Sequence, residues 1–121
     1  MGHVFVSAKV KGAEKVKVLE KVMVDTGASY TVLPQDTVEE VKAWELPLTL
    51  DLELGDGRKV KAKTYAAVLN IEDREAATIF VSFEGAKPVI GVRSLEDLGL
   101  RVNPMTSKLE PTRPRGMAYF Y

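Results

Sequence analysis

The chain has 121 residues, of which 45% are hydrophobic, so it is long and apolar enough for one globular domain with its own core. Its 17 basic and 17 acidic residues cancel, and a neutral chain has no electrostatic footprint for nucleic acid or for an anionic membrane surface. A single His, His3, and the absence of Cys argue against a zinc site, disulfides and His-dependent nucleophilic catalysis, so we expect neither a metal nor a cofactor.

Alternating apolar and polar residues predict that the chain is mainly β. Residues 4–10 form the first predicted strand, residues 11–15 a hairpin turn and residues 16–24 the second strand. Leu19 and Met23 are expected on one face of the second strand. Four valines are expected to share its other face: Val16, Val18, Val22 and Val24.

The clearest strand covers residues 48–54, where leucines alternate with polar residues. Asp56-Gly57 follows, and because both residues tolerate positive φ, this pair predicts a type I′ hairpin turn. The return strand is expected over residues 60–64. Further strands are expected over residues 65–71, 77–83 and 88–90, with a turn at 72–75.

Two short helices interrupt the predicted strands. Thr37 begins a sequence with capping-box spacing, and Ser94 is the expected N-cap of a second helix that Gly99 ends. Both helices are too short to be stable alone, so they must pack on the sheet. After residue 103 a turn and a returning strand at 108–110 are expected. Together these elements predict a barrel or sandwich in a single domain over residues 1–121.

The segment that carries chemistry covers residues 22–34, where an apolar strand runs into Asp25-Thr26-Gly27 and continues as another apolar run. A plain hairpin turn also accepts these three residues, so the tripeptide alone is moderate evidence. Its setting says more, because Val24 and Ala28 flank the carboxylate where a surface turn would have polar neighbours. The sequence therefore places Asp25 at the mouth of an apolar interior and favours a catalytic role over a structural one.

Residues 22–34 resemble the active-site loop of the retroviral-like (retropepsin-type) aspartic peptidases. Residues 89–100 resemble the second signature of that family, in which two apolar residues and a Gly, here Val89, Ile90 and Gly91, precede a short helix ending in Leu-Gly. Residues 54–60 fall where the family has its flap hairpin, and residues 103–110 resemble its closing hairpin. The resemblance covers about residues 4–110 in matching order, and it is closest to the small single-domain members of prokaryotes.

The resemblance implies a closed β-barrel of the acid-protease type with one or two short helices, assembled as a two-fold homodimer. It implies an aspartic endopeptidase in which each chain contributes one Asp, here Asp25. Two carboxylates about 3 Å apart cannot both ionise, so they share one proton, an effect for which this family is the standard example. One activates a water as general base and the other donates its proton to the scissile carbonyl, with no metal and no covalent intermediate.

The resemblance also assigns supporting roles. Thr26 reaches the loop of the partner subunit, Gly27 and Ala28 complete the active-site loop, and Gly91 lets the second signature pass close behind that loop. The flap tip that closes over the peptide is Gly55, Asp56 and Gly57. The chain departs from retroviral members in three places: Ser29 replaces an acidic residue, Ala28 replaces a Ser found in relatives, and Arg93 lies two residues after Gly91 instead of directly after it.

Other interpretations stay open. The same fold and dimer would also serve a catalytically weak peptide-binding or assembly module, whereas an aspartyl-phosphate enzyme would need a Lys beside the Asp and a phosphate loop that the sequence lacks. Trp44 is expected in the core or an interface rather than stacked on substrate. Residues 111–121 form either an interface strand, through Tyr119-Phe120-Tyr121, or a tail.

The expected partners are a second copy of the chain and an extended peptide or protein substrate, with no nucleic acid and no membrane. No apolar run reaches the length of about 18 residues that a membrane span needs, and no basic stretch followed by an apolar one marks a signal peptide. We therefore expect a cytoplasmic protein.

Overall fold

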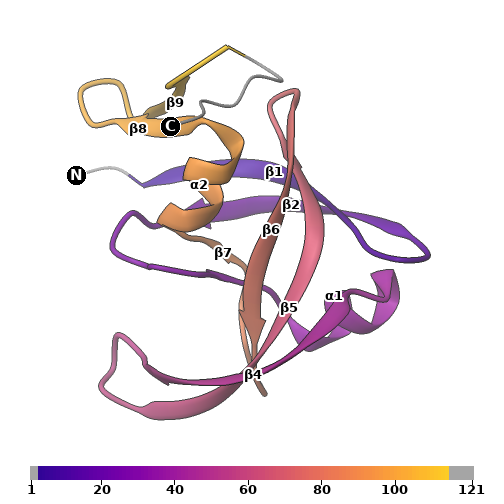
Figure 1. The fold of residues 1–121 in the computed structure, drawn as a ribbon. Helices are drawn as coiled ribbons and strands as arrows, with labels where there is room; N and C mark the ends of the chain where they lie inside the picture. Colours follow the sequence, from indigo (N-terminus) through magenta and orange to yellow (C-terminus); the bar gives the residue numbers. More distant parts are fainter. Residues whose placement is uncertain (1–2, 115–121) are drawn as a thin grey trace, which may run out of the picture.

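The computed structural model describes residues 3–114, which form nine strands and two short helices (Figure 1). The strands are β1 (Val4–Lys11), β2 (Val16–Val24), β3 (Thr31–Val32), β4 (Trp44–Glu53), β5 (Lys59–Ile71), β6 (Arg74–Ser82), β7 (Val89–Ile90), β8 (Leu100–Asn103) and β9 (Lys108–Pro111). The helices are α1 (Gln35–Val41) and α2 (Val92–Leu98). The prediction of a mainly β chain with two small helices is confirmed.

Seven strands form one sheet in the order β1-β2-β7-β3-β6-β5-β4, and β1 also pairs with β5. The additional pairing, from Lys9 opposite Asn70 to Lys11 opposite Val68, closes a ring of strands from which β4 extends as the outer strand. Strand β7 lies between β2 and β3, which are the two strands on either side of the Asp25 segment. The order of strands in space therefore differs from their order in sequence at the candidate site.

The core fills the inside of this ring. Its largest fully buried apolar side chains come from both halves of the chain: Val10, Val22, Leu33, Val41, Leu69, Ile71, Phe80, Val81, Ile90 and Leu95. Tyr65 stacks on Phe80 with ring centroids 5.6 Å apart. Helix α1 contributes Val38 and Val41, so the helices bury one face against the sheet, as their length requires.

The second strand does not keep one face. Val22 and Val24 are buried, but Val16 and Val18 are about half exposed, so the prediction that these four valines share a face is wrong. The register of β1 against β2 shifts between Val6 and Ala8, and Lys21 has a φ of 52°. An extra residue in a strand reverses which side chains point inward, which is how this bulge separates the two pairs of valines.

The hairpin turns also differ from the predicted types. In the loop of residues 54–58, Gly57 has positive φ but Asp56 does not, and Gly57 N–H donates to the carbonyl of Leu54. This is a three-residue hairpin with a left-handed Gly, not the type I′ turn predicted from Asp56-Gly57. The pair with positive φ at both residues is Glu72 and Asp73, between β5 and β6.

Both predicted helix caps are wrong, although Gly99 does end α2 in the left-handed conformation. Pro34 is the N-cap of α1 and Gly91 that of α2, so each helix begins three residues earlier than predicted. Thr37 and Ser94 consequently lie inside the helices and are buried. A pattern of Ser or Thr before an apolar run does not distinguish a cap from a hydroxyl that faces the core.

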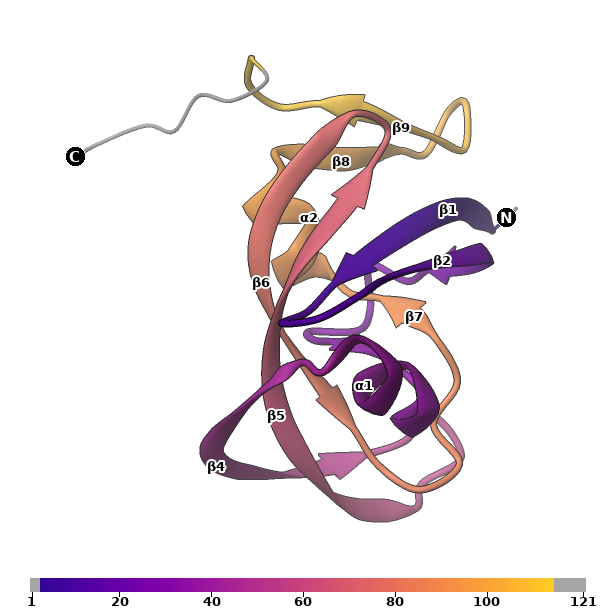
Figure 2. The same cartoon turned by 90° about the vertical axis from the view of Figure 1, so that its right-hand side faces the viewer.

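The hairpin of β8 and β9 forms as predicted and lies next to β1 and α2 in both views (Figures 1 and 2). Arg74 fastens it, because its guanidinium donates to the carbonyls of Leu98, Gly99 and Arg113. Trp44 is half exposed, so it is not a core residue of this chain. The predicted role of Tyr119-Phe120-Tyr121 lies outside the described residues.

The bulge gives a test in which neighbouring residues respond in opposite ways. At Lys21, Gly should be neutral or stabilise the fold by up to about 1 kcal/mol, whereas Val should cost about 1–2 kcal/mol, because a β-branched residue resists positive φ. At the extended and exposed Glu20, Gly should cost roughly 0.5–1 kcal/mol and Val should be tolerated. Urea unfolding of the four variants measures this, and the same ranking at both positions would contradict the bulge.

Candidate active site

Residues 25–30, called the Asp loop below, connect β2 to β3 and carry the candidate carboxylate. The N–H of Asp25 donates to the carbonyl of Ile90 at 2.9 Å, and the N–H of Ala28 donates to the carbonyl of Asp25 at 3.1 Å. The N–H of Gly27 donates to the Asp25 carboxylate at 2.8 Å. The backbone of the loop thus fixes both the main chain and the side chain of Asp25.

The sequence placed Asp25 at the mouth of an apolar interior, and the structure corrects this in part. Val24 is buried and Ala28 is half-buried, but Asp25 itself is exposed, as are Thr26 and Gly27. Residues 3–114 therefore leave the carboxylate open to water.

The second signature lies directly behind the Asp loop. Gly91 is buried there, and a Cβ added to it would lie 2.5 Å from both the carbonyl carbon and the carbonyl oxygen of Tyr30. The N–H of Val92 donates to the carbonyl of Ala28, and that of Arg93 to the carbonyl of Ser29. The start of α2 therefore holds the far side of the Asp loop at a distance that only Gly permits.

Arg93 takes a place that the sequence did not predict. Its guanidinium lies over the ring of Tyr30, 4.9 Å from the ring centroid, and it is exposed. A cation over an aromatic face stabilises the pair modestly at such an exposed site. Arg93 thus covers the outer side of the Asp loop.

Three buried hydroxyl groups join the elements behind the Asp loop, and sequence reasoning missed all of them. The Thr31 hydroxyl donates to Ser94 Oγ at 2.6 Å and accepts the N–H of Gly91 at 3.0 Å. Ser94 Oγ also lies 2.8 Å from Thr78 Oγ1. The only trace of this cluster in the sequence is a hydroxyl residue inside each of three apolar segments.

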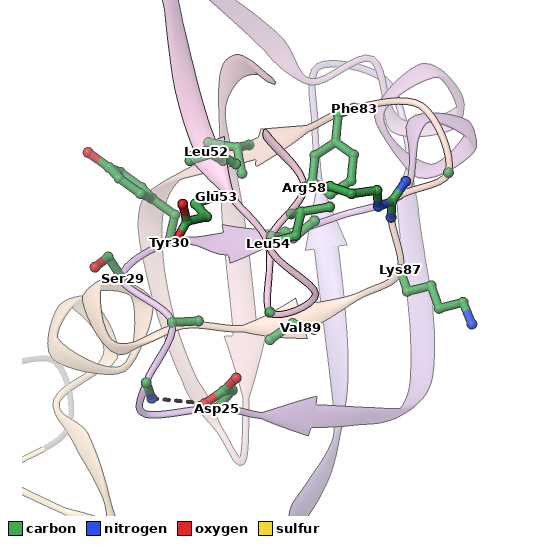
Figure 3. Close-up of a pocket in the computed structure, with 16 residues that line it drawn as sticks. Asp25, Ser29, Tyr30, Leu52, Glu53, Leu54, Arg58, Phe83, Lys87 and Val89 are labelled. Carbon is green, nitrogen blue, oxygen red and sulfur yellow. Dashed lines mark hydrogen bonds between the residues drawn. The ribbon is translucent and has the colours of Figure 1, made fainter. Parts of the chain in front are cut away.

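A groove of about 640 Å³ runs from Asp25 to the hairpin that joins β4 and β5 (Figure 3). Arg58 and Phe83 lie at one end, and Ser29 and Tyr30 lie at the other. Its walls are largely apolar: Ala28, Tyr30, Val32, Leu52, Leu54, Val81, Phe83 and Val89. This space suits an extended peptide with apolar side chains.

The loop of residues 54–58, called the flap loop below, contributes Leu54, Gly55 and Arg58 to the groove. Asp56 lies at its exposed tip, where its carboxylate accepts the backbone N–H of Arg58 at 3.0 Å and its side-chain Nε–H at 2.8 Å. These hydrogen bonds lower the pKa of Asp56, and the one from the backbone N–H of Arg58 has the larger effect. The contact is therefore strongest above the ordinary pKa of an Asp and is lost as the pH falls through the lowered value.

The structure brings four of the predicted site residues into one groove, namely Asp25, Gly27, Ala28 and Gly55. Ile90 and Gly91 are buried just behind it. Asp56 and Gly57 are at the exposed tip of the flap loop and do not line the groove. Thr26 lines a different hollow, together with Val92, Leu95, Leu100 and Val102.

Within residues 3–114, no group of three or more His, Asp or Glu side chains is placed to hold a metal ion. No helix in this part of the chain is long and apolar enough to cross a bilayer.

Comparison with known proteins does not assign the chain to a family. No protein-family model matches it, and no curated protein matches it significantly. The geometry of the Asp loop and its groove and the motif order in the sequence are therefore the features that indicate a function.

The close approach of Gly91 makes a first prediction for the site. Gly91→Ala should cost about 1–3 kcal/mol, because the new methyl group would collide with the backbone of Tyr30 and must push the Asp loop away. Gly55→Ala is the matched control, since its Cβ would meet no heavy atom within 4 Å. Urea unfolding compares the two, and equal stabilities would contradict the packing behind the loop.

The flap loop makes a second prediction. Arg58→Gln should raise the pKa of Asp56 part of the way to its ordinary value, because the side-chain hydrogen bond is lost while the backbone one remains. Arg101→Gln is the control. The side chains of Asn103 and Arg101 both lower the pKa of Glu110 in the β8–β9 hairpin, and loss of the Arg101 guanidinium should raise that pKa instead. NMR titration of the carboxyl carbons follows both groups, and an unmoved Asp56 in Arg58→Gln would refute the assignment.

Proposed function

We propose that the chain is one half of a retropepsin-like aspartic endopeptidase, which acts as a two-fold homodimer on extended, apolar stretches of polypeptide. The observation that carries this is the position of the Asp25 carboxylate, fixed by backbone hydrogen bonds at one end of an apolar groove that the flap loop also lines. The order of the three sequence motifs along the chain supports the same proposal.

The chemistry needs a second carboxylate. In the proposed dimer, the two Asp25 side chains lie side by side and share one proton, since two carboxyl groups so close cannot both ionise. The ionised group takes a proton from a bound water, and the protonated one donates to the carbonyl oxygen of the scissile bond. The chain supplies only one Asp-Thr-Gly sequence, so the second carboxylate must come from a second copy.

The exposure of Asp25, Thr26 and Gly27 in the single chain supports this assembly. A dimer axis beside the Asp loop would cover these residues and withdraw the carboxylates from water, which strengthens their interaction. Thr26 lines a separate hollow, whose apolar residues come from α2 and β8 and whose charged residues include Glu96 and Arg101. That face is the one we assign to the partner.

The groove supports the substrate class. Its apolar walls would take alternate side chains of an extended peptide, and the flap loop would close over the backbone and exclude water. Charged groups lie among the lining residues only as Asp25, Glu53, Arg58 and Lys87. An apolar residue on each side of the scissile bond is the expected preference.

The direct test is cleavage of an unfolded protein at acid to neutral pH by wild type and Asp25→Asn. The variant should lose about 10³-fold or more of the activity, because a neutral amide cannot act as general base or acid. Asp73→Asn is the matched control, since Asp73 is exposed in the turn between β5 and β6 and Asn tolerates its positive φ. Equal cleavage by wild type and Asp25→Asn would refute the proposal.

The alternative of a peptide-binding or assembly module makes a different forecast in the same assay. Wild type and Asp25→Asn would then bind an apolar peptide equally and cleave none. A peptide analogue with a tetrahedral hydroxyl in place of the scissile carbonyl separates the two, because it should bind wild type more tightly than Asp25→Asn only if the carboxylates act on that atom.

A separate experiment tests whether one active site uses the Asp25 carboxylates of both subunits. Wild type and Asp25→Asn are unfolded together in equal amounts and refolded. Half of the dimers then contain one wild-type and one variant subunit, and so a single Asp25. If both carboxylates are needed, the mixture should show about half the activity of the same amount of wild type refolded alone. An inert carrier protein replaces the variant in the control, and activity unaffected by the variant would refute a shared active site.

A further inference from the structure

The backbone N–H of Asp25 is held by the peptide group that joins Ile90 to Gly91. Its carbonyl accepts the N–H of Asp25 at 2.9 Å. Its N–H points the other way and donates to the Thr31 hydroxyl at 3.0 Å. Because a peptide unit is planar, any change in the tilt of this group at Thr31 moves the carbonyl that holds Asp25.

The Thr31 hydroxyl is in turn held by the buried hydroxyl cluster. It donates to Ser94 Oγ at 2.6 Å, and Ser94 Oγ pairs with Thr78 Oγ1 at 2.8 Å. The three residues come from β3, α2 and β6, and all are buried. The hydrogen bonds therefore run without a break from Thr78 in β6, through Ser94, Thr31 and the Ile90–Gly91 peptide group, to the main chain of Asp25.

The hydroxyl groups and the peptide group that make this connection belong to buried residues. In a medium of low dielectric constant a chain of hydrogen bonds is stronger than the same bonds in water, and each member polarises the next. Loss of one member leaves a buried N–H or hydroxyl without its partner, which costs more than the bond itself contributes. The arrangement is thus stiff, and loss of one hydrogen bond should weaken the neighbouring one.

We propose that Thr31 and Ser94 are positioning residues for Asp25, which act through the Ile90–Gly91 peptide group. Neither touches the groove, so neither contacts substrate. The catalytic consequence depends on the proposed peptidase function, whereas the effect on the Asp25 backbone does not. Loss of the Thr31 hydroxyl should loosen Asp25 and lower the rate of the chemical step without weakening the binding of peptide.

The test compares variants of nearly equal volume. Thr31→Val removes the hydroxyl and Thr31→Ser keeps one. Ser94→Ala removes the hydrogen bonds of Ser94 to Thr31 and Thr78 but leaves that of the Thr31 hydroxyl with the N–H of Gly91. Thr37→Val is the matched control, because Thr37 is also a buried Thr but its hydroxyl has no hydrogen-bond partner among the described residues. Ser94→Ala keeps the inference testable if Thr31→Val does not fold.

The first readout is hydrogen exchange at the amides of Gly91 and Asp25, measured relative to the core amide of Phe80 in the same variant. Thr31→Val should speed exchange at both by roughly tenfold or more beyond any change at Phe80, because each hydrogen bond is worth about 1 kcal/mol or more when buried. Ser94→Ala should act in the same direction but less, and Thr31→Ser and Thr37→Val should match wild type.

The second readout is peptide cleavage. We expect kcat to fall about tenfold or more in Thr31→Val with KM little changed, because small displacements of a reacting group are costly. Thr31→Ser should restore it. Unchanged relative exchange at Gly91 and Asp25 in both Thr31→Val and Ser94→Ala would overturn the inference. A wild-type protein that cleaves no peptide but shows the expected exchange pattern would refute the proposed function and still support the positioning of Asp25.

Discussion

The candidate site depends on the insertion of β7 between β2 and β3. These two strands flank the Asp loop, and without a strand between them they could pair directly, and residues 25–30 would be an ordinary turn. The two-residue strand β7 keeps them apart and offers the Ile90 carbonyl to the N–H of Asp25. Because Gly91 has no side chain, the chain behind the loop can approach it closely enough for this hydrogen bond to form.

The same arrangement explains why one copy of the chain is insufficient for the proposed chemistry. The Asp loop fixes the backbone and one carboxylate oxygen of Asp25 but leaves the residue exposed. A second carboxylate, supplied by symmetry, would both exclude water and keep one proton between the two. In the proposed dimer, each chain would thus contribute one half of the site and its partner the other half.

The groove and the hydroxyl cluster lie on opposite sides of the Asp loop and place different demands on it. On the groove side, apolar side chains from β4, β6 and β7 leave room for a peptide. On the inner side, Thr31, Ser94 and Thr78 fill the space with hydrogen bonds where apolar residues would pack as well. A buried polar cluster offers little stability over an apolar one, so its value here lies in fixing an orientation.

The sequence by itself determined the mainly β class, the approximate strands, both helices and the Asp-Thr-Gly segment, because periodicity and local motifs depend only on near neighbours. It did not determine the bulge at Lys21, the face of Val16, the true helix starts or the burial of Thr37 and Ser94. Those depend on which strands pair and on what each side chain then meets. Only the tertiary structure placed β7 behind the Asp loop, because this depends on contacts between residues more than 60 positions apart, such as Asp25 with Ile90. The exposure of Asp25 was likewise decided by the way in which the described strands pack around it.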